Sequence, residues 1–261
     1  MADPLASASL GNRTAVVTGG STHLGRAIAQ ALVSAGDLVY IASRDGHRCE
    51  LVAREITSSF GPCRSGTLDV TSLESVEQFF NHVLEQTDRL DVVVANAGGR
   101  ISDDAPAETR QRDVVELNLI GSLFTASTAC QLMAERGGGA VVLISSVNGV
   151  VGSDPRLYDG LRDFTPSDAA YHSAKGGVIQ LARSLAAKYG KAGIRVNAVS
   201  PGVIAETTVP RSLVDRIAER TPLNRAGTAQ DVASAVQFLA GPDASWITGQ
   251  NLVVDGGWSV W

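Results

Sequence analysis

Short runs of apolar residues alternate along the chain with longer stretches whose apolar positions recur at helical spacing. The short runs predict buried strands at residues 14–18, 38–42, 64–70, 91–95, 140–144, 194–199 and 251–254. The longer stretches predict helices at residues 24–35, 48–58, 72–83, 113–136, 168–189 and 228–240. Gly36 and the glycines at 137–139 are expected to end the helices that precede them.

Continuous apolar strands separated by helices are typical of a parallel sheet that is covered on both faces. The sequence therefore predicts an α/β protein, a three-layer doubly wound Rossmann fold with a parallel sheet of about seven strands. No repeat or linker divides the 261 residues, so we expect a single domain over 1–261 with an N-terminal tail at 1–12. The long irregular stretch at 152–167 reads as an insertion.

Charge and composition exclude several classes of protein. The 22 Lys and Arg residues against 27 Asp and Glu give a net charge of −5, which is unlike a nucleic-acid-binding surface. No apolar run approaches the roughly 20 residues of a membrane helix, and the N-terminus lacks a signal pattern. The 3 cysteines and 4 histidines show no metal spacing, so we expect no metal, no disulfide framework and a cytoplasmic location.

A glycine turn follows the first predicted strand and leads into a helix. Backbone N–H groups at such a junction, together with the positive end of the helix, favour a phosphate group. Residues 18–25 therefore predict a phosphate site of a dinucleotide, although a purely structural turn has the same signature.

Further motifs follow in order along the chain. Thr18, Gly19 and Gly25 match TGxxxGxG, with His23 in place of the middle glycine. The later motifs are NAG at 96–98, a serine pair at 145–146, YxxxK at 171–175, PG at 201–202 and DGG at 255–257. Over about residues 13–258 the chain thereby resembles the short-chain dehydrogenase/reductase family.

The resemblance implies a catalytic set of Asn118, Ser146, Tyr171 and Lys175. Tyr171 and Lys175 are four residues apart, so they share one helix face. A nearby ammonium lowers the pKa of a phenol, which lets Tyr171 act as general acid or base. Ser145 is the competing serine, but strand alternation points the two hydroxyls to opposite sides. Family analogy gives Asn118 the role of holding a water between Lys175 and solvent.

The resemblance also implies which residues bind the cofactor. These are Gly19, Ser21, Thr22, His23, Leu24, Gly25, Ser43, Arg44, Asp69, Val70, Asn96, Ala97, Gly98, Tyr171, Lys175, Pro201, Gly202, Val203 and Thr207. For His23, two interpretations remain open: a tolerated residue at the rim, or an imidazole that hydrogen-bonds a phosphate of the cofactor.

The end of the second predicted strand bears on the choice of nicotinamide cofactor. Ser43 stands where NAD-dependent folds carry an acid that binds the ribose, and Arg44 can bind a 2′-phosphate. NADP is therefore the expected cofactor. Asp45, which could reach the ribose or pair with Arg44, leaves NAD as the alternative.

Two segments are expected to shape the substrate site. The insertion at 152–167 offers Arg156 and Arg162 to a carboxylate or polyhydroxylated substrate, unless neighbouring aspartates neutralise them. By resemblance, residues 203–228 form a lid over the substrate. The expected substrate is a polar or sugar-acid-like small molecule.

The expected function is hydride transfer between NADP(H) and a secondary alcohol or ketone, with Tyr171 as general acid/base. Two alternatives remain: an epimerase or dehydratase that retains its cofactor, and a cofactor-binding regulator without turnover. By resemblance we expect a homodimer or homotetramer, to which Trp246, Trp258 and Trp261 add apolar surface. No nucleic acid or membrane partner is expected.

Overall fold

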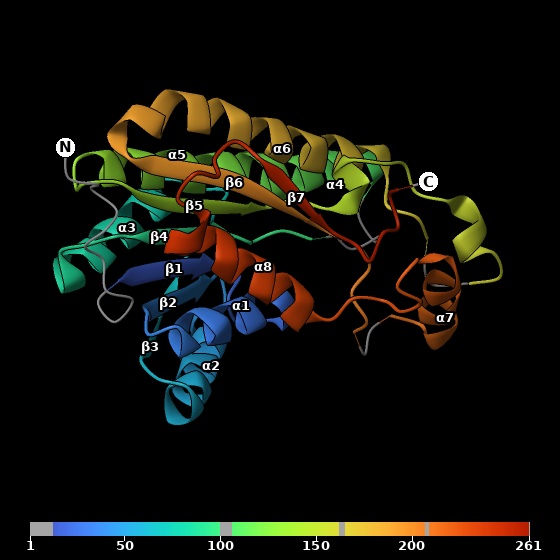
Figure 1. Cartoon of the computed structure of the whole chain (residues 1–261), viewed down its shortest axis with the longest axis horizontal. Coiled ribbons are helices and arrows are strands. Elements are labelled where there is room, and N and C mark those ends of the chain that lie inside the picture. Colours follow the sequence, from blue (N-terminus) through green and yellow to red (C-terminus); the bar gives the residue numbers. More distant parts are fainter. Residues whose placement is uncertain (1–12, 100–105, 162–164, 207–208, 261) are drawn as a thin grey trace.

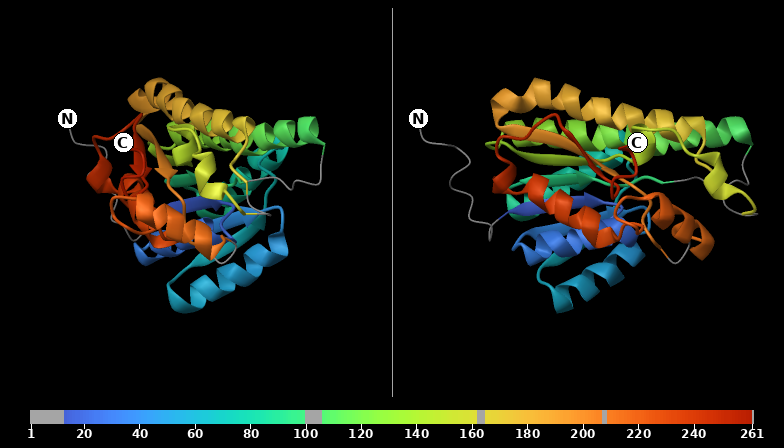
Figure 2. Two further views of the ribbon diagram at one scale, coloured as in Figure 1. Left: turned by 90° about the vertical axis from the view of Figure 1, so that its right-hand side faces the viewer. Right: turned by 45° about the vertical axis from the view of Figure 1, so that its right-hand side comes forward.

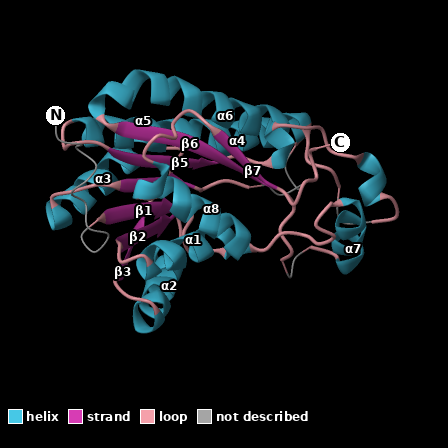
Figure 3. Ribbon diagram, in the orientation of Figure 1, coloured by secondary structure: helices cyan, strands magenta, loops and turns pink. Residues whose placement is uncertain are grey.

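A parallel sheet forms the centre of the protein in a computed structural model, which describes residues 13–99, 106–161, 165–206 and 209–260. Within these residues the sheet has 7 strands in the order β3-β2-β1-β4-β5-β6-β7 (Figures 1 and 3). The predicted doubly wound fold is confirmed. The strands are β1 Thr14–Thr18, β2 Leu38–Ser43, β3 Cys63–Thr67, β4 Val92–Ala95, β5 Gly139–Ile144, β6 Ile194–Pro201 and β7 Asn251–Val254.

Helices cover the sheet on both faces, as the three-layer prediction requires (Figures 1 and 2). The helices on one face are α1 His23–Ser34, α2 Gly46–Ser59 and α8 Ala229–Ala240. Those on the other face are α3 Leu73–Thr87, α5 Gly121–Ala134 and α6 Ala169–Tyr189. The remaining helices are α4 Ala107–Val115, which leads into α5, and α7 Arg211–Arg220, which lies beyond the carboxyl ends of the strands.

Alternating side chains of the central strands supply both cores. In β4, Val92 and Val94 pack toward α1, α2 and α8, whereas Val93 packs toward α3, α5 and α6. All three valines are fully buried. Because both faces of each strand are covered, the strand sequence is apolar throughout rather than alternating with polar residues.

Three predicted boundaries were wrong for local reasons. The third strand ends at Thr67 rather than at residue 70, because the Asp69 carboxylate accepts hydrogen bonds from the backbone and hydroxyl of Thr71 and turns the chain. The helix predicted at 113–136 belongs to a longer run that begins at Ala107 and contains a π-turn at Glu116–Ile120. Gly139, predicted to end that helix, instead begins β5.

The helical run Ala107–Ala134 is long and apolar enough, by length and composition, to be considered as a membrane span. Half of its most apolar window is buried inside the protein, and α5 contacts α3, α6, β4 and β5. Its apolar residues therefore serve as one layer of the core, which is a common reason for a helix to be this apolar.

A small separate core holds α7 against the insertion. Leu157 of the insertion packs with Leu213 and Ile217 of α7, and all three are buried. Arg216 donates hydrogen bonds to the carbonyls of Leu157 and Asp159 at 2.7 Å each. The predicted lid therefore contains a helix that the sequence analysis did not assign.

Candidate functional site

The glycine turn between β1 and α1 packs directly on the end of β4. The Asn96 amide donates to the Thr18 carbonyl at 2.8 Å, and the Thr18 hydroxyl accepts from the Asn96 and Ala97 backbones at 3.0 Å each. Gly19 has a φ of 65°, and a Cβ on Gly25 would collide with the Gly19 carbonyl. Side chains at these two positions would push the turn off β4, which explains why glycines stand there.

The N-terminus of α1 is open to an anion. Its N-cap, Thr22, makes no side-chain cap hydrogen bond, and the first turn carries no acidic residue. The first backbone N–H groups of the helix are therefore available to a ligand, and the helix dipole favours negative charge there. This geometry fits the pyrophosphate of a dinucleotide.

His23 adopts the backbone geometry that normally selects glycine. Its φ is 35°, a value that is rare for a residue with a Cβ. The imidazole Nδ1 lies 3.3 Å from the Glu206 carboxylate, and the side chain is about half exposed. Its binding to a phosphate stays a prediction, and the pairing with Glu206 was not anticipated.

Helix α6 carries Tyr171 and Lys175 into the site. The helix begins where the Asp168 carboxylate accepts a hydrogen bond from the Tyr171 backbone at 2.9 Å. The Lys175 ammonium lies 5.7 Å from the centre of the Tyr171 ring and donates to the Ile144 carbonyl at 3.0 Å. Burial lowers the pKa of Lys175 to about 8, because the charged form loses its hydration.

The two serines after β5 occupy different environments. The Ser145 hydroxyl donates to the Lys175 carbonyl at 2.8 Å and so joins β5 to α6. Ser146 caps the short 3₁₀ turn Val147–Gly149 and lines the cavity described below. The Ser145 hydroxyl is thus engaged with α6, both serines line the cavity, and the choice of Ser146 as the reacting serine stays a prediction.

Asn118 is fully buried in the π-turn that precedes α5. Its amide donates to the Gly99 carbonyl and accepts from the Gly99 backbone, both at 2.9 Å. A Cβ on Gly98 would lie 2.7 Å from the Asn118 oxygen and 3.2 Å from the Lys175 nitrogen. Asn118 therefore holds the loop after β4 beside Lys175.

An open cleft at the carboxyl ends of the strands, about 910 Å³ with its solvent-open space included, brings most of these groups together. From the predicted set it is lined by Thr22, His23, Leu24, Gly25, Asn96, Gly98, Ser146, Tyr171, Lys175, Pro201 and Gly202. The lining residues that were not in the predicted set are Gly99, Ile144, Ser145 and Glu206. Ligands of open α/β sheets commonly bind at this edge.

The other predicted cofactor residues are not part of this lining. Ser21 is buried and lies 3.4 Å from the Ser43 hydroxyl, which places the glycine turn beside the end of β2. Val70 is buried after β3. Val203 lines a second cavity, described below, and Thr207 lies outside the described residues.

The ends of β2 and β3 form the expected site for the adenosine part of the cofactor. Arg44 is exposed, and its charge contributes to lowering the pKa of Asp69, after the larger effect of the hydrogen bond from Thr71. The Asp45 carboxylate accepts from the Arg48 backbone at 2.9 Å and caps α2. Asp45 is therefore engaged in a helix cap.

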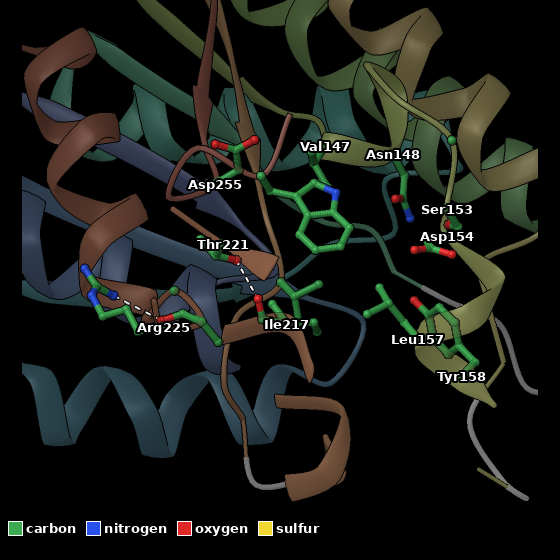
Figure 4. A pocket seen from close by; sticks show the side chains of 15 residues that line it. Val147, Asn148, Ser153, Asp154, Leu157, Tyr158, Ile217, Thr221, Arg225 and Asp255 are labelled. Atoms are coloured by element: carbon green, nitrogen blue, oxygen red, sulfur yellow. Dashed lines mark hydrogen bonds between the residues drawn. The ribbon is translucent and has the colours of Figure 1, made fainter. Parts of the chain in front are cut away.

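A second cavity, about 450 Å³ with its solvent-open space included, continues from the residues after Ser146 to α7 (Figure 4). The Asp154 carboxylate at its edge pairs with Arg156 at 2.8 Å and with Arg220 at 2.8 Å. The side chain of Arg156 is 77% exposed. Its pairing with Asp154 agrees with the interpretation in which a neighbouring aspartate neutralises it. Arg162 lies outside the described residues.

Comparisons with known proteins agree with this geometry. A family model described as enoyl-(acyl carrier protein) reductase matches residues 20–259. The 3-oxoacyl-[acyl-carrier-protein] reductase MabA of Mycobacterium avium is 35% identical over 254 residues, which cover 94% of this chain and 89% of that protein. The cis-4-hydroxycyclohexanecarboxylate dehydrogenase of Sinomonas cyclohexanicum is 34% identical over 254 residues, which cover 95% of this chain and 96% of that protein.

Solved structures share the fold over the whole chain. The crystal structure of NADPH-dependent 3-quinuclidinone reductase from Rhodotorula rubra matches with a TM-score of 0.85 and 27% identity, covering 100% of this chain and 96% of that chain. Sequence motifs, sheet order and relatives therefore lead to one conclusion. The chain belongs to the short-chain dehydrogenase/reductase family, whose members are NAD(P)-dependent oxidoreductases.

Proposed function

We propose that the protein transfers a hydride between NADP(H) and a secondary alcohol or ketone, with Tyr171 as general acid/base. The observation that carries this proposal is the cavity in which Ser146, Tyr171 and Lys175 meet the glycine turn. The open N-terminus of α1 and the glycines of the turn fit a dinucleotide, and nicotinamide supplies or accepts the hydride when bound.

Each protein group has a task that follows from its surroundings. The Tyr171 hydroxyl gives a proton to the substrate oxygen during reduction and takes it back during oxidation. The Ser146 hydroxyl hydrogen-bonds the same oxygen and stabilises its developing charge. Lys175, fixed by the Ile144 carbonyl, keeps a positive charge near the phenol and favours its ionised form.

The proposed preference for NADP rests on the charge of Arg44 and on the helix cap that Asp45 forms. No carboxylate stands at Ser43, and Asp45 is committed to capping α2. The exposed guanidinium of Arg44 is then the group that recognises a 2′-phosphate. The relative from Rhodotorula rubra, which is described as NADPH-dependent, supports this choice.

Replacing the phenol tests the catalytic proposal. Tyr171→Phe is expected to abolish oxidation of NADPH with a panel of ketones, followed by absorbance, while NADPH fluorescence still reports binding. Tyr189→Phe, on the same helix, is the matched control and should keep activity. Turnover by Tyr171→Phe at the wild-type rate would overturn the proposed role.

Replacing Arg44 tests the cofactor proposal. Arg44→Ala is expected to lower kcat/KM for NADPH by about 10-fold or more and to leave NADH nearly unaffected, because a charged hydrogen bond is lost. Arg48→Ala, an exposed neighbour on α2, is the control. Equal losses with both cofactors would show that Arg44 does not read the 2′-phosphate.

The proposal extends to the organisation of the protein. Residues 1–261 act as a single catalytic domain in the cytoplasm, a location that suits the three buried free thiols. A homodimer or homotetramer is supported by the position of β7 at the edge of the sheet, in the part of the chain that the structure describes, and by Trp246, which is 98% exposed. Trp258 instead packs within the subunit, against the small core at α7, and Trp261 lies outside the described residues.

A further inference from the structure

His172, the neighbour of Tyr171, has both ring nitrogens in hydrogen-bond contact. Nδ1 lies 2.8 Å from the Asp168 carbonyl oxygen, one turn back along α6. Nε2 lies 3.1 Å from the Ser153 hydroxyl, on the insertion. Both His172 and Ser153 are half-buried, so these contacts are partly shielded from water.

The two contacts fix the direction of each hydrogen bond. A carbonyl oxygen can only accept, so the proton of the neutral imidazole sits on Nδ1. Nε2 is then the acceptor, and the Ser153 hydroxyl donates its proton to it. The Ser153 oxygen is left with lone pairs only, and it can bind a ligand only as an acceptor.

Ser153 lines the second cavity, which begins next to the reacting centre. Val147 and Asn148 in its wall directly follow Ser146, and Val203 directly follows Gly202. Asn148, Ser153 and Asp154 lie on one side of this cavity, opposite Thr221 and Arg225 (Figure 4).

Two other polar groups that line this cavity are already engaged. Arg225 is paired with Asp231 at 2.7 Å, and the Thr221 hydroxyl donates to the Ile217 carbonyl at 2.7 Å. Much of the remaining wall is apolar, with Leu157, Tyr158, Ile217, Val203 and Trp258. A ligand that fits this wall has an apolar body and few charges.

We propose that Ser153, oriented by His172, accepts a hydrogen bond from a second hydroxyl or amine of the substrate. This inference rests on the proposed function, because the first polar group is the carbonyl or alcohol at Tyr171. The substrate class is then a compact, largely apolar ketone or alcohol with a hydrogen-bond donor away from the reacting carbon. His172 is a positioning residue, and Ser153 determines specificity.

Matched probes test this directly. Cyclohexanones with a hydroxyl at position 2, 3 or 4 are compared with their methyl ethers, which cannot donate, at one pH for all variants. For at least one ring position, wild-type kcat/KM is expected to favour the hydroxyl form by about 5-fold, mainly through KM. Ser153→Ala is expected to bring this ratio to about 1.

Two further variants separate orientation from simple structural support. His172→Phe removes the acceptor at Nε2, and the ratio is expected to fall as it does in Ser153→Ala. His172→Gln, whose carbonyl can accept from Ser153, is expected to recover part of it. Ser173→Ala, exposed on the same helix, should leave the ratio at its wild-type value. A ratio that survives His172→Phe overturns the positioning role.

Failure of this inference can be distinguished from failure of the proposed function. Turnover of ketones without any preference for a hydroxyl, or a preference that survives Ser153→Ala, overturns the inference alone. If no ketone is reduced, the proposed function fails. The role of Ser153 is then decided by calorimetry, which compares the binding of cyclohexanediols with that of their monomethyl ethers. If wild type binds a diol more tightly than its ether and Ser153→Ala does not, the role is supported. If wild type binds both equally, the role is overturned.

Discussion

Lys175 allows a quantitative test of how the site is built, because its amine is buried beside the Tyr171 ring. Only 3% of the residue is exposed, and its ammonium donates to the Ile144 carbonyl. Burial lowers the pKa of Lys175 from 10.5 to about 8. The perturbation is Lys175→Met, which keeps the length of the side chain and removes the titrating group.

The sign of the effect follows from proton binding. Between about pH 8 and 10.5 the folded protein holds fewer protons at Lys175 than the unfolded chain does, so stability rises with pH across this window. Below the window the folded state carries the full cost of burying the charge. The difference between 10.5 and about 8 corresponds to about 3 kcal/mol of unfolding free energy.

Urea denaturation from about pH 7 to about pH 10.5 measures this effect. The unfolding free energy of wild type minus that of Lys175→Met is expected to rise by about 3 kcal/mol across the range. Lys191→Met, at an exposed position just after the same helix, is the control and should show a flat difference. A flat difference for Lys175→Met as well would refute the argument that burial depresses its pKa.

Two further predictions concern stability. Because His23 has φ 35, His23→Gly is expected to be more stable than His23→Ala by about 1 kcal/mol in urea denaturation, and equal stabilities would contradict the left-handed geometry. Arg13 and Asp37 form a buried pair at 2.7 Å, so Asp37→Asn, which leaves the guanidinium without its carboxylate, is expected to cost about 3–5 kcal/mol. Arg13→Met combined with Asp37→Leu should cost less in the same assay, and a cost of Asp37→Asn below about 1 kcal/mol would argue against a buried charge.

The sequence was sufficient to predict the sheet because burial on both faces leaves a strong pattern. Every strand of the sheet was anticipated, although the third was extended too far, since the Asp69 turn depends on one side chain and not on periodicity. Tyr171 and Lys175 could be placed on one face from their spacing alone. The choice of Ser146 over Ser145 by strand alternation stays a prediction, because both serines follow the end of β5 at Ile144 and both line the cavity.

Other features depend on contacts that a linear pattern does not contain. Helix α7 was missed because only Leu213, Val214 and Ile217 mark its apolar side, in a segment bounded by Pro210 and Pro222. The contacts of His23 with Glu206 and of Ser153 with His172 join segments that the fold brings together. The π-turn at Asn118 leaves no trace in residue type, because its residues also fit an ordinary helix.

The bonds that Arg216 and Arg220 make from α7 have a consequence for evolution and for engineering. Arg216 holds two carbonyls of the insertion, and Arg220 holds the Asp154 carboxylate. The two walls of the second cavity are therefore tied together, and a displacement of one carries the other with it. Exchanging the insertion for that of another enzyme would remove the acceptors of these hydrogen bonds, so we expect a change of substrate range to be easier when both segments change together.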